Sequence, residues 1–191
     1  MRTVDAYLPV ASVVLIYLAR IMELGAKRDR ISGPVRETLT LRLFILAGTL
    51  MGIGAIGEFL IAGRALNWLM FGGGWACALV SFAIRRSAIA ALGKFWSLHV
   101  EIRANHQFVR DGPFRWMRHP TYFSMILELL AAGLILNARF APLAVTAVFV
   151  PALLLRLRLE EEALVEKFGE AYRAYQRSTP ALFPYKFPRA R

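Results

Sequence analysis

The sequence predicts an all-α, polytopic membrane protein with about five transmembrane helices. Three observations carry this prediction: the composition, the long apolar runs and the placement of the charges. Of 191 residues, 57% are hydrophobic and 19% are charged, which is too apolar for a water-soluble domain of this size. A soluble bundle of unusually apolar helices is the alternative.

Five apolar runs are candidates for spans, because a bilayer core about 30 Å thick needs about 20 mostly apolar residues per helix. They cover residues 6–19, 43–63, 65–84, 120–138 and 140–155. The first and last are short, but arginines at their ends can reach the headgroups. We expect residues 1–88 to form a scaffold of three helices and residues 89–191 to form a core with two more, within one folding unit.

Basic residues gather after the first, third and fifth runs. The N-terminus and the two short turns carry one each, namely Arg2, Arg64 and Arg139, whereas the tail from Arg156 onward carries eight. Cytoplasmic loops hold an excess of Lys and Arg, so we expect the N-terminus outside and the C-terminus in the cytoplasm, in the inner membrane of a prokaryote. The net charge of +11 follows this pattern, and we therefore expect no nucleic-acid partner.

The first run also has features of a cleaved signal peptide. Asp5 in the region that should be basic, and Arg20 with Glu23 at the end of the run, favour a membrane span instead. Cys77 is the one cysteine, which excludes an intramolecular disulfide and a cysteine metal cluster. We expect no metal.

Glycines inside the apolar runs indicate helix packing. Gly52, Gly54 and Gly57 spell G-x-G-x-x-G, but a dinucleotide-binding turn requires a preceding strand and a βαβ unit. Small residues on a transmembrane helix allow a neighbouring helix to approach closely. We expect this role here and at residues 72–74.

Two carboxylates lie inside predicted spans, where each costs at least ~2.5 kcal/mol on insertion scales. We expect a structural role for Glu58, near the outer side. Glu128 lies nine positions beyond His119, about 13 Å into its helix. It lines a substrate cavity or is a protonated acid that hydrogen-bonds a neighbouring helix, and both interpretations stay open.

Two polar segments hold the residues best suited to catalysis or binding: residues 112–122, GPFRWMRHPTY, and residues 156–161, RLRLEE. On a helix, Arg156 and Glu160 are one turn apart, so the guanidinium and the adjacent carboxylates can orient one another; an ordinary ion pair is the alternative. The apolar spacing beyond Arg156 predicts that the last helix continues past the membrane as an amphipathic helix and ends before Pro180. Gly112 and Pro113 predict a turn.

These segments, with the later pattern F-G-x-x-Y-x-x-Y from Phe168 and T-P-x-L-x-P from Thr179, resemble the isoprenylcysteine carboxyl methyltransferase family. The resemblance covers about residues 92–185 and extends more loosely to phospholipid N-methyltransferases. It implies S-adenosyl-L-methionine as methyl donor, S-adenosyl-L-homocysteine as product, and a lipophilic acceptor that enters from the bilayer. The donor pocket would lie on the cytoplasmic side, without a Rossmann fold, beneath the C-terminal helix.

The resemblance also implies site residues. We expect the cofactor to be bound by His106, Arg118, His119, Pro120, Tyr122 and Glu160, and we expect Arg156 and Glu161 to be catalytic, aligning or activating the acceptor. Ser124 and Glu128 depart from the family pattern on the predicted acceptor side, so we expect them to bind the substrate. A carboxylate acceptor needs only alignment, whereas a phenol benefits from a base such as Glu161 or Glu128.

The predicted function is O-methylation of a carboxyl or of a phenolic or enolic hydroxyl. A small lipid-like phenol, pyrone or acid and a lipid-modified protein are both candidate acceptors, in contact with membrane lipid. N-methylation of a phospholipid or amine is the alternative reaction. An alternative of another class is a non-enzymatic membrane subunit or channel whose basic face binds anionic lipid.

Overall fold

The computed structural model describes residues 3–25, 38–93, 96 and 108–185. The elements are α1 (Thr3–Gly25), α2 (Leu39–Ala62), α3 (Trp68–Leu92), the 3-10 helix η2 (Gly112–Arg115), α4 (Pro120–Ile135), α5 (Phe140–Phe168) and α6 (Glu170–Ser178). These described residues contain no strand, which confirms the all-α prediction.

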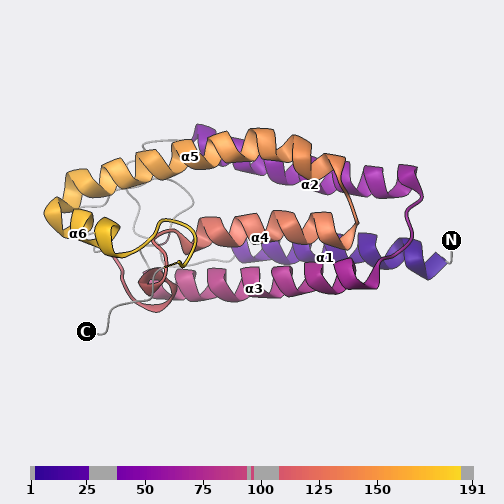
Figure 1. Cartoon of the computed structure of the whole chain (residues 1–191), viewed down its shortest axis with the longest axis horizontal. Coiled ribbons are helices and arrows are strands. Elements are labelled where there is room, and N and C mark those ends of the chain that lie inside the picture. Colours follow the sequence, from indigo (N-terminus) through magenta and orange to yellow (C-terminus); the bar gives the residue numbers. More distant parts are fainter. Residues whose placement is uncertain (1–2, 26–37, 94–95, 97–107, 186–191) are drawn as a thin grey trace.

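The five long helices lie lengthwise beside one another (Figure 1). α2 and α5 form one layer, and α1, α3 and α4 form the other. The connections from α2 to α3 and from α4 to α5 lie at the end that holds the N-terminus, whereas α6 lies at the opposite end. This arrangement separates two short turns from the polar segments singled out in the sequence.

Three helices, α2, α3 and α5, are long and apolar enough to cross a membrane, and α4 is a shorter apolar helix. Large apolar side chains face outward from these three helices: Ile61 is 91% exposed, Leu69 86% and Leu143 70%. Such outward faces suit lipid rather than water. The chain is therefore an integral membrane protein, while the prediction of five spans remains untested for α1 and α4.

Gly74 brings α3 and α4 into backbone contact. A Cβ placed at Gly74 would lie 2.6 Å from Cγ1 of Ile135 and 2.9 Å from the carbonyl oxygen of Ala131. This confirms the predicted packing role at Gly74, whereas Gly72 and Gly73 have open space around them. Gly74 belongs to the predicted scaffold of residues 1–88 and α4 to the predicted core of residues 89–191, so this contact connects the two. The division of the chain at residue 88 stays a prediction.

The glycines of the α2 motif also lie at contacts between helices, but these contacts are less close than the one at Gly74. A Cβ at Gly52 would lie 3.4 Å from the ring of Tyr17, and a Cβ at Gly54 would lie 3.3 Å from Cβ of Ala141. Gly57 has open space around it. The motif therefore lies within a helix, as predicted, and two of its three glycines face neighbouring helices.

α3 differs from the prediction at both ends. It begins at Trp68 because Oδ1 of Asn67 accepts hydrogen bonds from the amides of Leu69 and Met70. It continues to Leu92, so Arg85, the first of the basic residues that follow the predicted span 65–84, lies inside the helix and is 1% exposed. Acidic partners from other helices allow this buried charge.

The C-terminal amphipathic helix is interrupted, contrary to the prediction of one continuous helix. Gly169 adopts φ 55° and ψ −131°, a conformation open to glycine, and separates α5 from α6. α6 ends at Ser178, before Pro180, as predicted. α5 therefore extends past its apolar part, and α6 turns back toward the start of α4 (Figure 1).

Glu58 caps α5. Its carboxylate accepts hydrogen bonds from the amides of Arg139, Phe140 and Ala141 at 2.7, 2.9 and 3.0 Å, and it pairs with Arg64 at 3.0 Å. A negative charge is favourable at a helix N-terminus, where amides lack partners within the helix. The contacts confirm the structural role predicted for Glu58.

Replacing Glu58 with alanine should lower the free energy of unfolding by about 1–2 kcal/mol, the range expected for loss of a helix cap. Thermal unfolding of the purified protein in detergent measures the effect. Glu170→Gln, at an exposed carboxylate paired with Arg173, is the matched control and should unfold like the wild type. Equal stability of Glu58→Ala and wild type would contradict the capping role.

Candidate functional site

A cavity of about 450 Å³ lies among the helices and is lined by residues from all six α-helices. It extends from Arg118, just before α4, along that helix to Leu129. Most of the sequence-predicted site residues that the structure describes line it: Arg118, His119, Tyr122, Glu128, Arg156 and Glu160.

Tyr122 links the two polar segments of the sequence. Its hydroxyl donates a hydrogen bond to Glu160 and accepts one from Nε of Arg156 at 3.1 Å. Nη1 of Arg156 donates to Oγ1 of Thr40 at 3.1 Å, and Arg156 is only 4% exposed. The structure therefore brings Arg156 and Glu160 together through a hydroxyl that belongs to α4.

Thr40 is a site residue that the sequence analysis missed. It lies at the start of α2, is fully buried and accepts a hydrogen bond from Nη1 of Arg156. A single threonine beside an apolar run carries no sequence pattern that could mark it, since the contact spans 116 positions in the chain.

Arg118 and His119 bind the chain segment that follows α6. Their amides donate to the carbonyl oxygens of Pro180 and Ala181, both at 2.9 Å. Nη1 of Arg118 donates to the carbonyl oxygens of Gln176 and Thr179. Pro120 is buried at the first position of α4, where its missing N–H costs nothing. The Arg-His-Pro motif is thus the docking point for the C-terminal segment.

Glu161 completes this docking point. Its Oε1 accepts from Nε of Arg118 at 2.7 Å and lies 3.0 Å from Nε2 of His119, and its Oε2 accepts from Gln176 at 3.0 Å. The ring of His119 also stacks on that of Tyr122, with centroids 5.5 Å apart. Glu161 thus faces the motif and α6, whereas Arg156 contacts Tyr122 and Thr40.

Aromatic rings form the wall of the cavity beside α6. Phe108 packs against Tyr172 and Tyr175 at centroid distances of 5.6 and 5.8 Å, and the Arg110 guanidinium lies over Phe108. Burial raises the pKa of both tyrosines, so both stay neutral. The Tyr175 hydroxyl donates to the carbonyl oxygen of Phe114 at 2.5 Å.

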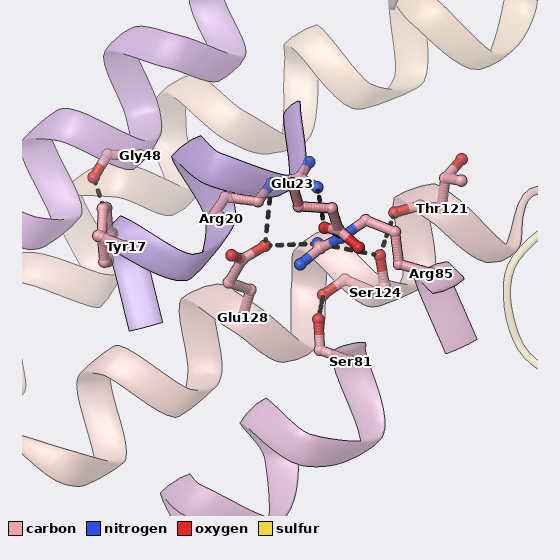
Figure 2. Close-up of polar contacts among 9 residues, drawn as sticks. All are labelled: Tyr17, Arg20, Glu23, Gly48, Ser81, Arg85, Thr121, Ser124 and Glu128. Atoms are coloured by element: carbon pink, nitrogen blue, oxygen red, sulfur yellow. Dashed lines mark hydrogen bonds and ion pairs between the residues drawn. The ribbon is translucent and has the colours of Figure 1, made fainter. Parts of the chain in front are cut away.

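Glu128 contacts a neighbouring helix, and its role in substrate binding stays a prediction. It lines the cavity, and it forms an ion pair with Arg85 of α3 at 2.8 Å (Figure 2). Ser124, one turn earlier, is fully buried and does not line the cavity; its Oγ donates to the carbonyl oxygen of Thr121 and lies 3.5 Å from Nη1 of Arg85. Ser124 therefore contacts Arg85 rather than the cavity.

His106, predicted to bind the cofactor, lies outside the described residues. Within the described ranges, no group of three or more His, Cys, Asp and Glu side chains has the arrangement of a metal site.

Comparison with known proteins gives one family match. The model of the isoprenylcysteine carboxyl methyltransferase family matches residues 74–166, which contain α4, most of α5 and the Arg-His-Pro motif.

Three curated relatives are similar to the chain. An uncharacterized protein of Bacillus subtilis, YpbQ, is 31% identical over 118 residues, 60% of this chain and 67% of that protein. The protein-S-isoprenylcysteine O-methyltransferase of Schizosaccharomyces pombe is 29% identical over 53% of this chain and 44% of its own. The methanethiol S-methyltransferase of Mycobacterium tuberculosis is 29% identical over 65% of this chain and 50% of its own. The chain thus spans between 44% and 67% of these relatives.

Proposed function

This chain belongs to the isoprenylcysteine carboxyl methyltransferase family, and on that premise we propose that it is an S-adenosyl-L-methionine-dependent methyltransferase of the membrane. The proposed reaction is O-methylation of a carboxyl or of a phenolic or enolic hydroxyl on a lipophilic acceptor. The observation that carries the proposal is the cavity that joins the Arg-His-Pro motif and the Arg156–Tyr122–Glu160 contacts to an apolar interior.

The residues beside α6 fit the donor. S-adenosyl-L-methionine supplies an electrophilic methyl group on a positively charged sulfur. The carboxylate of Glu160 suits the positive charge or hydroxyl groups of such a molecule, and the aromatic wall offers ring faces to a purine base. We propose that Arg118, His119, Pro120, Tyr122 and Glu160 hold the donor, together with His106.

The other part of the cavity fits the hydrocarbon of the acceptor. Phe44, Ile45, Met125, Leu129 and Phe149 line it. Methyl transfer mainly requires alignment and exclusion of water, because a carboxylate is already a nucleophile at neutral pH. We propose that Arg156 aligns the acceptor oxygen, as guanidinium groups hold carboxylates well. We assign Glu161 a positioning role through Arg118 and His119.

We also propose that the donor site faces the cytoplasm and that the protein lies in the inner membrane of a prokaryote. The site lies at the end of the molecule opposite to the two short turns that carry Arg64 and Arg139 (Figure 1). Excess positive charge marks the cytoplasmic side, and the donor is a charged molecule that does not cross lipid.

Two measurements test the proposed function. Saturable binding of S-adenosyl-L-homocysteine to the detergent-solubilised protein, measured by calorimetry, is the expected result; its absence favours the non-enzymatic subunit. Incubation of the protein with lipid extracts and methyl-labelled donor should then label an ether or ester product. Label on nitrogen or sulfur would contradict O-methylation while leaving methyl transfer in place.

Replacing His119 with alanine should weaken binding of S-adenosyl-L-homocysteine at least ten-fold. The variant removes the ring that stacks on Tyr122 and contacts Glu161, and the donor pocket loses two of its supports. Calorimetry measures the affinity, and thermal unfolding shows whether the fold is intact. Glu170→Gln, at an exposed residue of α6, is the control. Unchanged affinity in His119→Ala would remove His119 from the donor site.

A further inference from the structure

Tyr172 of α6 carries a hydroxyl that is buried without a partner among the described residues. The residue is 2% exposed and lines the cavity. Its hydroxyl makes no hydrogen bond to any residue that the structure describes. Tyr175, one turn later, differs, because its hydroxyl donates to the carbonyl oxygen of Phe114. Since buried hydroxyls in folded proteins are generally hydrogen-bonded, that of Tyr172 calls for a partner.

The hydroxyl of Tyr172 is accessible from the cavity. In the described part of the chain, Nη2 of Arg85 is the one side-chain nitrogen or oxygen that is both fully buried and unpartnered. The unpartnered hydroxyl of Tyr172 therefore keeps some accessible surface. Its electrostatic neighbours include Glu160 and Arg118, and both of these residues line the cavity. A molecule in this part of the cavity can therefore reach the hydroxyl.

The carboxylates near Tyr172 have other partners. Glu160 accepts a hydrogen bond from Tyr122, and Glu161 accepts one from Arg118. Burial raises the pKa of Tyr172, and the negative charges of Glu161 and Glu160 raise it further, so the hydroxyl keeps its proton and can donate it in a hydrogen bond. Together Glu160, Glu161 and Arg118 carry one net negative charge, which disfavours an anionic ligand group beside the hydroxyl.

The wall around the Tyr172 ring is aromatic and already holds a cation. The ring packs edge to face with Phe108 and Tyr175, at centroid distances of 5.6 and 5.8 Å. The Arg110 guanidinium lies 4.6 Å from the centre of the Phe108 ring and 5.3 Å from that of Tyr175. A flat, neutral ring system suits such a wall, whereas an ammonium group would be repelled by Arg110. The neutral part of S-adenosyl-L-methionine is its nucleoside.

We propose that the hydroxyl of Tyr172 donates a hydrogen bond to the nucleoside part of the methyl donor. This inference rests on the proposed function and adds a residue of α6 to the donor site. The carboxylate and ammonium of the amino-acid part then bind away from Tyr172. In this arrangement α6 contacts the donor directly and is more than a cover over the pocket.

Replacing Tyr172 with phenylalanine removes the hydroxyl and keeps the ring. Affinity of the full chain in phosphatidylcholine nanodiscs is measured with tritiated S-adenosyl-L-homocysteine, and by competition with 5′-deoxy-5′-methylthioadenosine, which keeps the nucleoside and lacks the amino-acid part. We expect both ligands to bind the variant about three- to ten-fold more weakly, the effect of one lost hydrogen bond. Unchanged affinities overturn the proposal. A loss that spares 5′-deoxy-5′-methylthioadenosine also overturns it, because the hydroxyl would then contact the amino-acid part.

Thermal unfolding in the absence of ligand separates binding from a structural role. Because the Tyr172 hydroxyl has no partner in the described part of the chain, Tyr172→Phe should unfold at the wild-type temperature or above it. Tyr175→Phe loses the hydrogen bond to Phe114 and should unfold at a lower temperature, which shows that the assay detects one lost hydroxyl contact of α6. If Tyr172→Phe is destabilised as much as Tyr175→Phe, the hydroxyl serves the fold and the proposal is wrong.

Tyr7→Phe is the matched control for binding. Tyr7 lies on α1, is 72% exposed and does not line the cavity, so loss of its hydroxyl should leave both affinities unchanged. Failure of the wild type to bind S-adenosyl-L-homocysteine would contradict the proposed function itself. Binding by the wild type with equal affinity in Tyr172→Phe would refute only the role of Tyr172.

Discussion

Replacing Arg156 with methionine should lower kcat/KM for methyl transfer by at least about 100-fold, or about 2.7 kcal/mol of transition-state stabilisation. Arg156 is 4% exposed, lies in the wall of the cavity and donates hydrogen bonds to the hydroxyls of Tyr122 and Thr40. Methionine fills a similar volume but donates no hydrogen bond, so the acceptor oxygen loses its alignment. Transfer of label from methyl-labelled donor to the acceptor measures the loss.

Arg158→Met provides the control for this prediction. Arg158 lies two positions further along the same helix and is exposed. Its replacement removes one positive charge, as Arg156→Met does, but leaves the lining of the cavity unchanged. It should retain nearly full activity. Affinity for S-adenosyl-L-homocysteine separates the two possible roles of Arg156: acceptor alignment leaves it unchanged, and a role in donor binding lowers it. Turnover within three-fold of wild type in a folded Arg156→Met variant would exclude Arg156 from the mechanism.

Replacing Gly74 with alanine should destabilise the protein by about 3 kcal/mol or more. The added Cβ would overlap the carbonyl oxygen of Ala131 and the amide of Ile135, each 2.9 Å away. These are backbone atoms of α4 and cannot rotate aside, so α3 and α4 must separate, and overpacking of this kind is costly. Thermal unfolding in detergent and the yield of folded protein measure the effect.

Gly73→Ala is the matched control, since a Cβ at this position meets nothing within 4 Å. Alanine is the better helix former by about 1 kcal/mol, so this variant should be as stable as the wild type or more stable. If both alanine variants unfold at the wild-type temperature, the close approach of α3 and α4 is not what stabilises this pair of helices.

Features that depend on local sequence could be predicted. The apolar runs predicted the order of the long helices, Pro180 marked the end of α6, and the position of Glu58 near a turn predicted to lie outside indicated its structural role. The Arg-His-Pro motif and the Arg156 segment were both placed in the site. For the helices and their ends, neighbouring residues carry the signal, through helix propensity, turn chemistry or hydrophobic periodicity, whereas the two site segments were predicted from the family resemblance.

Features that depend on distant partners could not be predicted. Arg85 follows an apolar run, as a loop arginine would, and only Glu23 and Glu128 from two other helices explain its burial within α3. Thr40 gains its role from Arg156, and Gly169 interrupts a pattern that is periodic on both sides of it. The sequence does not encode these long-range contacts in its spacing.

The ion pair between Arg85 and Glu128 has a consequence for how the chain enters the bilayer. α4 has 16 residues, about 24 Å, and carries a carboxylate, so on its own it would partition poorly into lipid. The cost of placing Glu128 in lipid falls once it pairs with Arg85, which lies on α3 and is synthesised earlier. We therefore expect α4 to leave the translocon only after it has met α3. Because α3 is synthesised first, Arg85 is already present when Glu128 enters the translocon.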